Sequence, residues 1–593
     1  MKNQKFSLLK LIINLFIPLG AFYCLENYTH EIYKTAPLSQ LINYLIFLFA
    51  GIFLTALFGN TMVAGIILCL LTLSIGIANY FVMAFRGNPI LPWDLKSIHT
   101  ALSVADNYTF SIDDRFVIST VGIIFFILFS LLCKTKYSNL KKRFSIVALS
   151  FIALLGMKTA LCTEAITDKV LTTTYLFTQW ASYRDNGFVV SFLENTKYLD
   201  IDAPKGYDSK KLEEAMKAYS TNDDTSSNKS PNVIVIMNES FSDLSVLHEF
   251  KTSTDYMPYI HSLQKSDHAV TGNLYVSVCG GNTASTEFEF LTGDTMAFLP
   301  SGSVAYQQYI SNSLPTWVSS LAKKGYQTVA MHPYGASGWN RDKVYPYLGF
   351  DETYFKEEFI GSKILRKYVS DESLYDKIID VFDKKDDNPL FTFAVTMQNH
   401  GGYSQLYDNF PITVSLTDIK NRPATENYLS LVKESDRAFE ELTNYFKNVD
   451  EDTIIVMFGD HQPNDYVSTC IADLTGVPAE QRSLQEQQNR YLVPFVIWAN
   501  YDMEAKHDIT TSVNYLNILV SKMAGIPLTK YQTYLDSLQK ELPVITANMC
   551  IDSKGNYTGI QDINKYSKQL QRYKELQYMH LFDDKNRVNS IFE

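Results

Sequence analysis

Residues 232–238 read N-V-I-V-I-M-N, and the acidic residue Glu239 follows them directly. A continuous run of β-branched and apolar residues of this length is typical of a buried strand in a parallel sheet. Similar runs occur at residues 326–331, 390–397, 453–458 and 493–498, and helical patterns lie between runs, at residues 314–324, 372–383, 424–448 and 513–524. The alternation predicts an α/β domain with a mainly parallel sheet between helices.

Acidic and imidazole side chains follow four of these five runs. In an open parallel sheet, ligands bind at the carboxyl ends of the strands. Each residue alone has an ordinary explanation as a turn or cap residue, but their joint placement predicts a functional site at one edge of the sheet. In chain order these residues are Glu239, His332, His400, Asp460 and His461.

A second segment, residues 278–293, reads V-C-G-G-N-T-A-S-T-E-F-E-F-L-T-G. Its apolar positions Ala284, Phe288 and Leu291 recur at helical spacing, which places Thr283 at or next to a helix N-terminus. Free backbone N–H groups at such a terminus favour an anion such as phosphate. The simpler interpretation is that Thr283 is only an N-cap.

The residue types at the predicted sheet edge suit a metal ion. Glu239, Asp460 and His461 offer two carboxylates and one imidazole, a set that suits Mn²⁺, Mg²⁺ or Zn²⁺. Thr283 completes this set if its hydroxyl also binds the metal. A metal-bound hydroxyl has a lowered pKa and becomes a usable nucleophile near neutral pH. The sequence therefore predicts Thr283 as a catalytic nucleophile.

A third segment, residues 332–342, reads H-P-Y-G-A-S-G-W-N-R-D. Trp339 offers a flat apolar face for a small polyol, and the guanidinium of Arg341 matches two phosphate oxygens. We interpret the segment as a substrate pocket that includes His332. The alternative is an ordinary loop anchored by a buried tryptophan.

The first part of the chain has the composition of a membrane domain. Its five apolar runs, at residues 6–24, 41–58, 62–85, 116–133 and 144–162, are each close to the roughly 20 residues that cross a bilayer. Lysine and arginine without acids precede the first run and fill the loop at residues 134–143, which the positive-inside rule places in the cytoplasm. Five crossings would carry everything after residue 162 outside the cell.

The sequence predicts four regions: membrane helices at residues 1–162, a surface connector with a flexible linker at 163–231, an extracellular catalytic domain at 232–550, and a helical tail at 551–593. The formal net charge of -11 argues against nucleic acid as a partner. The cysteine spacing gives neither a disulfide framework nor a zinc motif, and leaves a single Cys279 to Cys470 bridge open. Other histidines, including His580, are expected to be solvated.

The motifs together resemble those of the lipoteichoic acid synthases, the sulfatase-like phosphoglycerol transferases of the alkaline phosphatase superfamily. The resemblance runs from the first apolar run to about residue 525. Asn282 and Tyr334 depart from the family pattern, at positions where a change alters the acceptor or the head group. The motifs are N-E-S-F-S at 238–242, G-G-N-T at 280–283, W-N-R-D at 339–342, Q-N-H-G-G-Y at 398–403, F-G-D-H at 458–461 and V-P-F-V-I at 493–497.

The resemblance implies a multi-pass bacterial membrane enzyme with an extracellular catalytic domain. It implies one Mn²⁺ at Glu239, Thr283, Asp460 and His461, with Thr283 as nucleophile. It also implies a phosphoglycerol pocket, made of His332, Trp339, Arg341 and His400. The implied reaction moves glycerol phosphate from phosphatidylglycerol to a growing glycerol phosphate polymer, lipoteichoic acid, and both histidines are candidate proton carriers.

Two alternatives stay open at the level of sequence. One is a related transferase or hydrolase that acts on another phosphate ester, such as phosphoethanolamine. The other is a catalytically silent receptor for phosphoglycerol polymers, which the complete set of predicted metal ligands and nucleophile argues against. The sequence gives neither the oligomeric state nor the role of the C-terminal tail.

Overall fold

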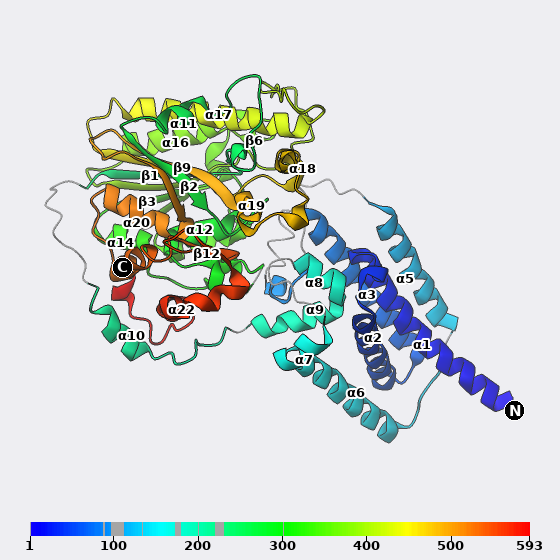
Figure 1. Ribbon diagram of the computed structural model, residues 1–593. Coiled ribbons are helices and arrows are strands. Elements are labelled where there is room, and N and C mark those ends of the chain that lie inside the picture. Colours follow the sequence, from blue (N-terminus) through cyan, green and yellow to red (C-terminus); the bar gives the residue numbers. More distant parts are fainter. Residues whose placement is uncertain are drawn as a thin grey trace. The chain divides into compact units, whose positions relative to one another are not determined.

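The computed structural model describes residues 2–86, 89–96, 112–132, 134–171, 179–199, 201–219, 230–300 and 302–593 (Figure 1). The chain forms two compact units. The first is Met1–Ile201 with Pro300–Gly302, and the second is Asp202–Leu299 with Ser303–Glu593. The flexible linker predicted at residues 221–231 falls outside the described residues except for its last two positions.

The first unit is helical. Its helices are α1 (Lys2–Thr29), α2 (Pro37–Phe58), α3 (Thr61–Arg86), α5 (Asp114–Leu132), α6 (Leu140–Leu161), α7 (Glu164–Val170), α8 (Gln179–Asn186) and α9 (Phe188–Asn195). In the described part of the chain, four helices are long and apolar enough to cross a membrane, namely α2, α3, α5 and α6. Many of their apolar side chains are exposed, as suits contact with lipid.

Helix α1 covers the first of the five expected spans. Its side chains before Leu15 lie outside the described part, and α1 is not among the four apolar helices counted there. The number of apolar helices counted in the described part is therefore four, one fewer than the five spans expected from the sequence. The number of membrane passes stays a prediction.

The second unit is built on an eight-stranded sheet in the order β10-β2-β9-β8-β1-β7-β3-β4. All neighbouring strands are parallel except that β9 runs antiparallel to both β2 and β8. The expected α/β class with a mainly parallel sheet is confirmed. The strands are β1 (Asn232–Asn238), β2 (Ala269–Tyr275), β3 (Gln327–Met331), β4 (Glu352–Tyr354), β7 (Leu390–Val395), β8 (Thr453–Gly459), β9 (Leu492–Ala499) and β10 (Lys506–Ser512).

The five runs between residues 232 and 498 that the sequence analysis assigned to strands all form strands. Sequence patterning missed β2, β4 and β10. Strand β10 reads K-H-D-I-T-T-S and lies at the sheet edge, where it does not need a continuous apolar run. Strand β2 is interrupted by Gly272, where an added Cβ would lie 2.0 Å from the backbone oxygen of Ile509. Only glycine allows β10 to approach this closely.

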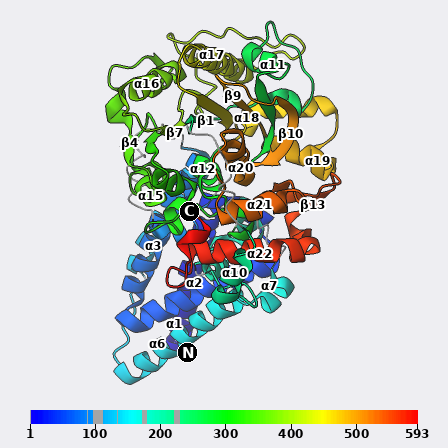
Figure 2. The ribbon, with the colours of Figure 1, turned by 90° about the vertical axis from the view of Figure 1, so that its left-hand side faces the viewer.

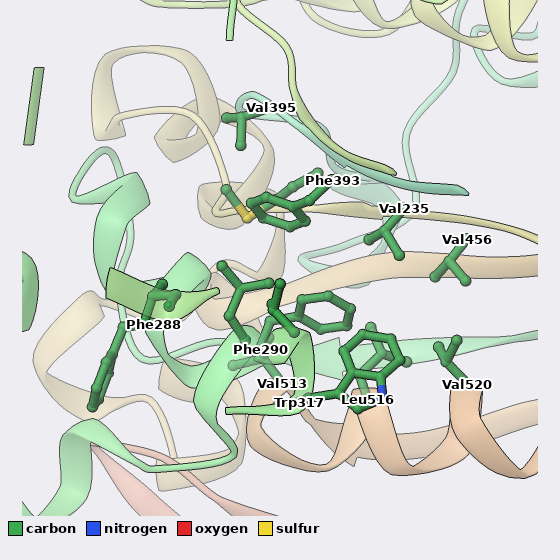
Figure 3. Close-up of a cluster of buried hydrophobic side chains, with 14 of the residues drawn as sticks. Val235, Phe288, Phe290, Trp317, Phe393, Val395, Val456, Val513, Leu516 and Val520 are labelled. Atoms are coloured by element: carbon green, nitrogen blue, oxygen red, sulfur yellow. The ribbon is translucent and has the colours of Figure 1, made fainter. Parts of the chain in front are cut away.

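Helices cover both faces of the sheet (Figure 1). Side chains of β1 alternate between two cores, so that Val233 and Val235 lie on the face of α12 (Thr283–Thr292), α14 (Trp317–Lys323) and α20 (Val513–Met523). Ile234 and Ile236 lie on the face of α11 (Pro258–Leu263), α16 (Asp371–Lys384) and α17 (Pro423–Phe446). Figure 3 shows Phe290 of α12 within the first of these cores. Packing against the sheet thus fixes the position of α12.

The C-terminal segment packs into the second unit rather than standing free (Figure 2). Helix α22 (Ser567–Leu581) buries Tyr573 and Leu576 in a core shared with α21 (Lys530–Gln539). His580 is fully buried and is bonded through Nδ1 to Asp294 and through Nε2 to the carbonyl of Pro315. The expectation that His580 is solvated is therefore wrong, because a helix that reads as polar has one face committed to the core.

The two cysteines for which the sequence left a bridge open, Cys279 and Cys470, are both free thiols, so no bridge joins them.

The remaining elements are short. The short elements of the second unit are α10 (Ser209–Met216), α13 (Ala305–Gln308), α15 (Arg341–Leu348), α18 (Asp465–Ala472), α19 (Leu484–Gln488), β5 (Ile364–Leu365), β6 (Tyr368–Val369), β11 (Val544–Ile545), β12 (Met549–Ile551) and β13 (Tyr557–Gly559).

Candidate active site

The site lies at the carboxyl ends of four neighbouring parallel strands, β8, β1, β7 and β3. Strand β8 ends before Asp460 and His461, β1 before Glu239, and β3 before His332. His400 stands on the segment that follows β7. The structure therefore brings these strand-end residues to one edge, as the sequence predicts, and all but His400 are buried.

Glu239, Asp460 and His461 form a compact cluster. One ligand atom of each lies within 4.8 Å of the others. Asp460 Oδ2 and His461 Nε2 are buried and have no hydrogen-bond partner among the described residues, although they are 3.2 Å apart. Unpartnered polar atoms at such depth are costly unless something else binds them.

Neighbouring groups orient these ligand atoms. Asp460 Oδ1 accepts the backbone N–H groups of Ser240 at 2.7 Å and of His461 at 2.8 Å, which directs Oδ2 into the cluster. His461 Nδ1 lies 2.9 Å from the carbonyl of Gln462, and a proton on Nδ1 leaves Nε2 as a lone-pair donor. Burial, and then the neighbouring Glu239 carboxylate, raise the pKa of Asp460 above its ordinary value. The donor set fits a divalent cation bound by oxygen and nitrogen.

Thr283 is the first residue of α12, and Asn282 rather than Thr283 is the N-cap. The Thr283 side chain is 6% exposed, and its hydroxyl donates to Glu239 Oε2 at 3.4 Å. It is therefore not used as a cap and instead faces the cluster. The simpler interpretation of Thr283 as an N-cap is not met in this structure.

Backbone strain gathers at this site. Ser240, Asn282 and Trp339 all have positive φ, at 51°, 67° and 58°. Non-glycine residues in this region cost about 1–3 kcal/mol each and persist where the surrounding structure fixes them, often at functional sites. Two of the three flank residues of the candidate centre, Glu239 and Thr283.

Arg341 does not present a free guanidinium edge. Its Nε atom donates to Glu287 Oε1 at 3.0 Å, and Nη2 also binds Glu287, a buried residue of α12. Tyr345 donates to the other oxygen of Glu287 at 2.8 Å. The guanidinium edge that the sequence analysis assigned to phosphate therefore binds Glu287. Trp339 is partly buried against the core.

The two candidate histidines are held differently. His332 Nδ1 lies 3.0 Å from the Val395 carbonyl, and burial, followed by the charge of Arg341, lowers the pKa of His332 well below its ordinary value. His400 Nδ1 lies 3.1 Å from the hydroxyl of Tyr368. Burial also lowers the pKa of His400, against the opposing effect of Glu239. In both histidines, burial therefore favours the neutral imidazole.

Arg366 is a site residue that the sequence reasoning missed. It lies between β5 and β6 with φ at 54°, is 4% exposed, and donates from Nη2 to the carbonyls of Gln398 at 2.8 Å and His400 at 2.6 Å. Its Nε and Nη1 atoms are buried without hydrogen-bond partners in the described residues. No local pattern marks Arg366, because the β5–β6 hairpin brings it to the site.

We expect Arg366→Met to lower turnover by about 10- to 100-fold, because the loop that carries His400 loses two charge-assisted hydrogen bonds. Arg366→Lys should recover part of the loss, since it keeps the charge but not the paired geometry. Separate measurement of kcat and KM checks this, with Lys367→Met as the neighbouring control. Wild-type kinetics for Arg366→Met would remove Arg366 from the site.

Comparison with known proteins agrees with this geometry. Residues 231–526 match the model of the sulfatase family. These residues form a sulfatase-family domain. The resemblance of the chain to the lipoteichoic acid synthases is confirmed by relatives of that name.

Three of the similar proteins show how identity and coverage vary among the matches. A putative cyclic β-1,2-glucan modification protein of Rhizobium meliloti is 32% identical over 72% of this chain and 66% of its own length. Lipoteichoic acid synthase 1 of Bacillus subtilis is 25% identical over 55% of this chain and 52% of its own length. The structure of Streptococcus pyogenes phosphoglycerol transferase GacH, in complex with sn-glycerol-1-phosphate, has a TM-score of 0.54 at 20% identity and covers 66% of this chain and 98% of its own.

The coverage and the identity of these matches decide what they show about this chain. The chain spans about half to two thirds of the length of the first curated relatives it matches, and GacH at 20% identity shows the fold alone. Membrane association agrees with the four apolar helices of the described part.

Proposed function

We propose that the protein is a membrane-bound phosphoglycerol transferase that moves glycerol phosphate from phosphatidylglycerol to an acceptor through a covalent Thr283 intermediate. The observation that carries the proposal is the Thr283 hydroxyl, 3.4 Å from Glu239, beside the unpartnered ligand atoms of Asp460 and His461. A sulfatase-family domain that holds this constellation supports phosphoester chemistry.

In the first step, Thr283 Oγ attacks the phosphorus of the lipid and the bond from phosphorus to the diacylglycerol oxygen breaks. His400 and His332 are the candidate proton carriers, because burial favours the neutral form of each imidazole, which can take the threonine proton and give it to the leaving oxygen. The product is diacylglycerol, with glycerol phosphate bound to Thr283.

In the second step, an acceptor hydroxyl takes the place of diacylglycerol. The acceptor oxygen bonds to phosphorus, the Thr283 Oγ–phosphorus bond breaks, and the acceptor proton passes to the threonine oxygen. Trp339 offers a face for the glycerol group. Arg341 can contact a phosphate oxygen only with atoms that Glu287 does not engage.

The residues that would hold a divalent ion are Glu239, Asp460 and His461, with Thr283 as the fourth ligand. When bound, the ion supplies positive charge that lowers the pKa of the threonine hydroxyl and offsets charge on the phosphoryl oxygens. We propose Mn²⁺ for this role, with Mg²⁺ or Zn²⁺ as alternatives.

The membrane unit fits a lipid donor. The positive charges near the ends of the apolar runs support an extracellular catalytic unit on a bacterial membrane. Proteins with related sequences are named for different polymers, lipoteichoic acid in the synthases and cyclic β-1,2-glucan in the Rhizobium protein. We keep a glycerol phosphate polymer as one candidate acceptor.

We expect the purified full-length protein to release diacylglycerol from labelled phosphatidylglycerol when Mn²⁺ is present and to lose this activity with a chelator. Added Mn²⁺ should also raise the thermal midpoint of the protein, because it binds only the folded state. The control is the same assay with labelled phosphatidylethanolamine in place of phosphatidylglycerol. Consumption of phosphatidylethanolamine alone would support the phosphoethanolamine alternative instead.

A further inference from the structure

A polar cavity of about 430 Å³ lies in the second unit, outside the cluster of candidate catalytic residues. Its walls come from the loop before α12, from the start of α18 and from α19 with the residues after it. The lining residues are Cys279, Gly280, Asn464, Asp465, Gln487, Gln488, Arg490 and Tyr491.

Two of the three wall segments of the cavity also carry the proposed nucleophile Thr283 and the candidate metal ligands Asp460 and His461. Gly280, three residues before Thr283, donates its backbone N–H to the carbonyl of Gln462 at 3.0 Å, and Gln462 directly follows His461. An added Cβ at Gly280 would lie 3.3 Å from the Cα of Asn464. This close approach joins the two loops and sets the cavity next to the segment that presents Thr283.

The lining is rich in amides and has no free cation. Asp465 and Arg490 form an ion pair at 2.7 Å, and Arg490 also donates to Gln462 Oε1 at 2.7 Å and to the carbonyl of Pro463 at 3.1 Å. The guanidinium is therefore engaged by the protein itself. Among the described residues that line the cavity, no other carries a positive charge.

The amides provide both hydrogen-bond donors and acceptors. Asn464 and Gln487 are exposed at the cavity, and Gln488 is 7% exposed with an Oε1 atom that has no hydrogen-bond partner among the described residues. Amide side chains pair in both directions with hydroxyl groups, which donate and accept in the same way. An anionic polymer would instead call for unpaired lysine or arginine.

We propose that this cavity binds the acceptor, and that the acceptor is a neutral polyhydroxyl chain, a carbohydrate, rather than a glycerol phosphate polymer. The proposal rests on the proposed function and names its second substrate. A carbohydrate hydroxyl oxygen bonds to the phosphorus on Thr283, the Oγ–phosphorus bond breaks, and the hydroxyl proton passes to the threonine oxygen. The charge of the cavity thereby selects the acceptor.

The experiment uses the full-length protein in lipid vesicles with labelled phosphatidylglycerol and two competing acceptors. These are a neutral glucan oligosaccharide and a short glycerol phosphate oligomer. We expect the wild-type protein to label the glucan. In the Asn464→Ala/Gln487→Ala variant, the ratio of transfer onto glucan to transfer onto water should fall at least about tenfold.

Gln485→Ala is the matched control, because Gln485 is an exposed amide of the same helix that does not line the cavity. It should keep the wild-type ratio, and circular dichroism should be the same for all three proteins. Preferential labelling of the glycerol phosphate oligomer, or an unchanged ratio in the double variant, would overturn the acceptor proposal. Absence of diacylglycerol release by the wild-type protein would instead overturn the proposed function.

Discussion

Thr283→Ala is expected to abolish glycerol phosphate transfer, with a loss of at least about 10³-fold in turnover. Alanine keeps the helical backbone of α12 but removes the hydroxyl that lies 3.4 Å from Glu239. The variant lacks the oxygen atom that bonds to phosphorus in the proposed first step, so that covalent bond cannot form. Diacylglycerol release from labelled phosphatidylglycerol measures the effect.

Two companion variants make this test specific. Thr283→Ser keeps a hydroxyl and should retain part of the activity. Thr292→Ala removes a hydroxyl from the far end of the same helix, where it bonds only to the helix and to the turn that follows, and should behave as wild type. Intact-protein mass spectrometry should detect a glycerol phosphate adduct in the wild-type protein. Substantial transfer by Thr283→Ala would exclude Thr283 as the nucleophile.

Glu287→Ala is expected to give the largest loss of stability, about 3–5 kcal/mol. Glu287 is fully buried and is the ion-pair partner of Arg341, which is 2% exposed. Its removal leaves the Arg341 charge and the Tyr345 hydroxyl without their acceptor in the core. The thermal midpoint of the full-length protein measures this effect and should fall by about 5–10 °C.

The double variant Glu287→Ala/Arg341→Met is the control for this interpretation. It removes both charges, so it should be more stable than Glu287→Ala alone. Arg341→Met by itself should also lose stability, because it leaves the Glu287 carboxylate buried without its partner. A loss of turnover in the still folded variant would place Arg341 at the substrate. A Glu287→Ala protein as stable as the wild type would show that the pair does not stabilise the fold.

The sequence located most of the sheet because buried parallel strands require continuous apolar runs. All five runs became strands, and the polar residues after four of them reached one edge. Strand β10 was missed because an edge strand does not need a continuous apolar run, and strand β2 was missed because Gly272 interrupts its run. His580 was misjudged because one residue type on a polar-looking helix does not reveal which face is buried.

The sequence by itself determined the residue types at the candidate centre, since Glu239, Asp460, His461 and Thr283 each stand at a strand or helix end that pattern alone defines. Only the tertiary structure decided which groups the arginine side chains bind. It paired Arg341 with Glu287 and Arg490 with Asp465, and it brought Arg366 to the loop of His400. The reason is physical: a strand end is set by local apolar patterning, whereas the partner of a buried charge depends on which distant segments fold against it.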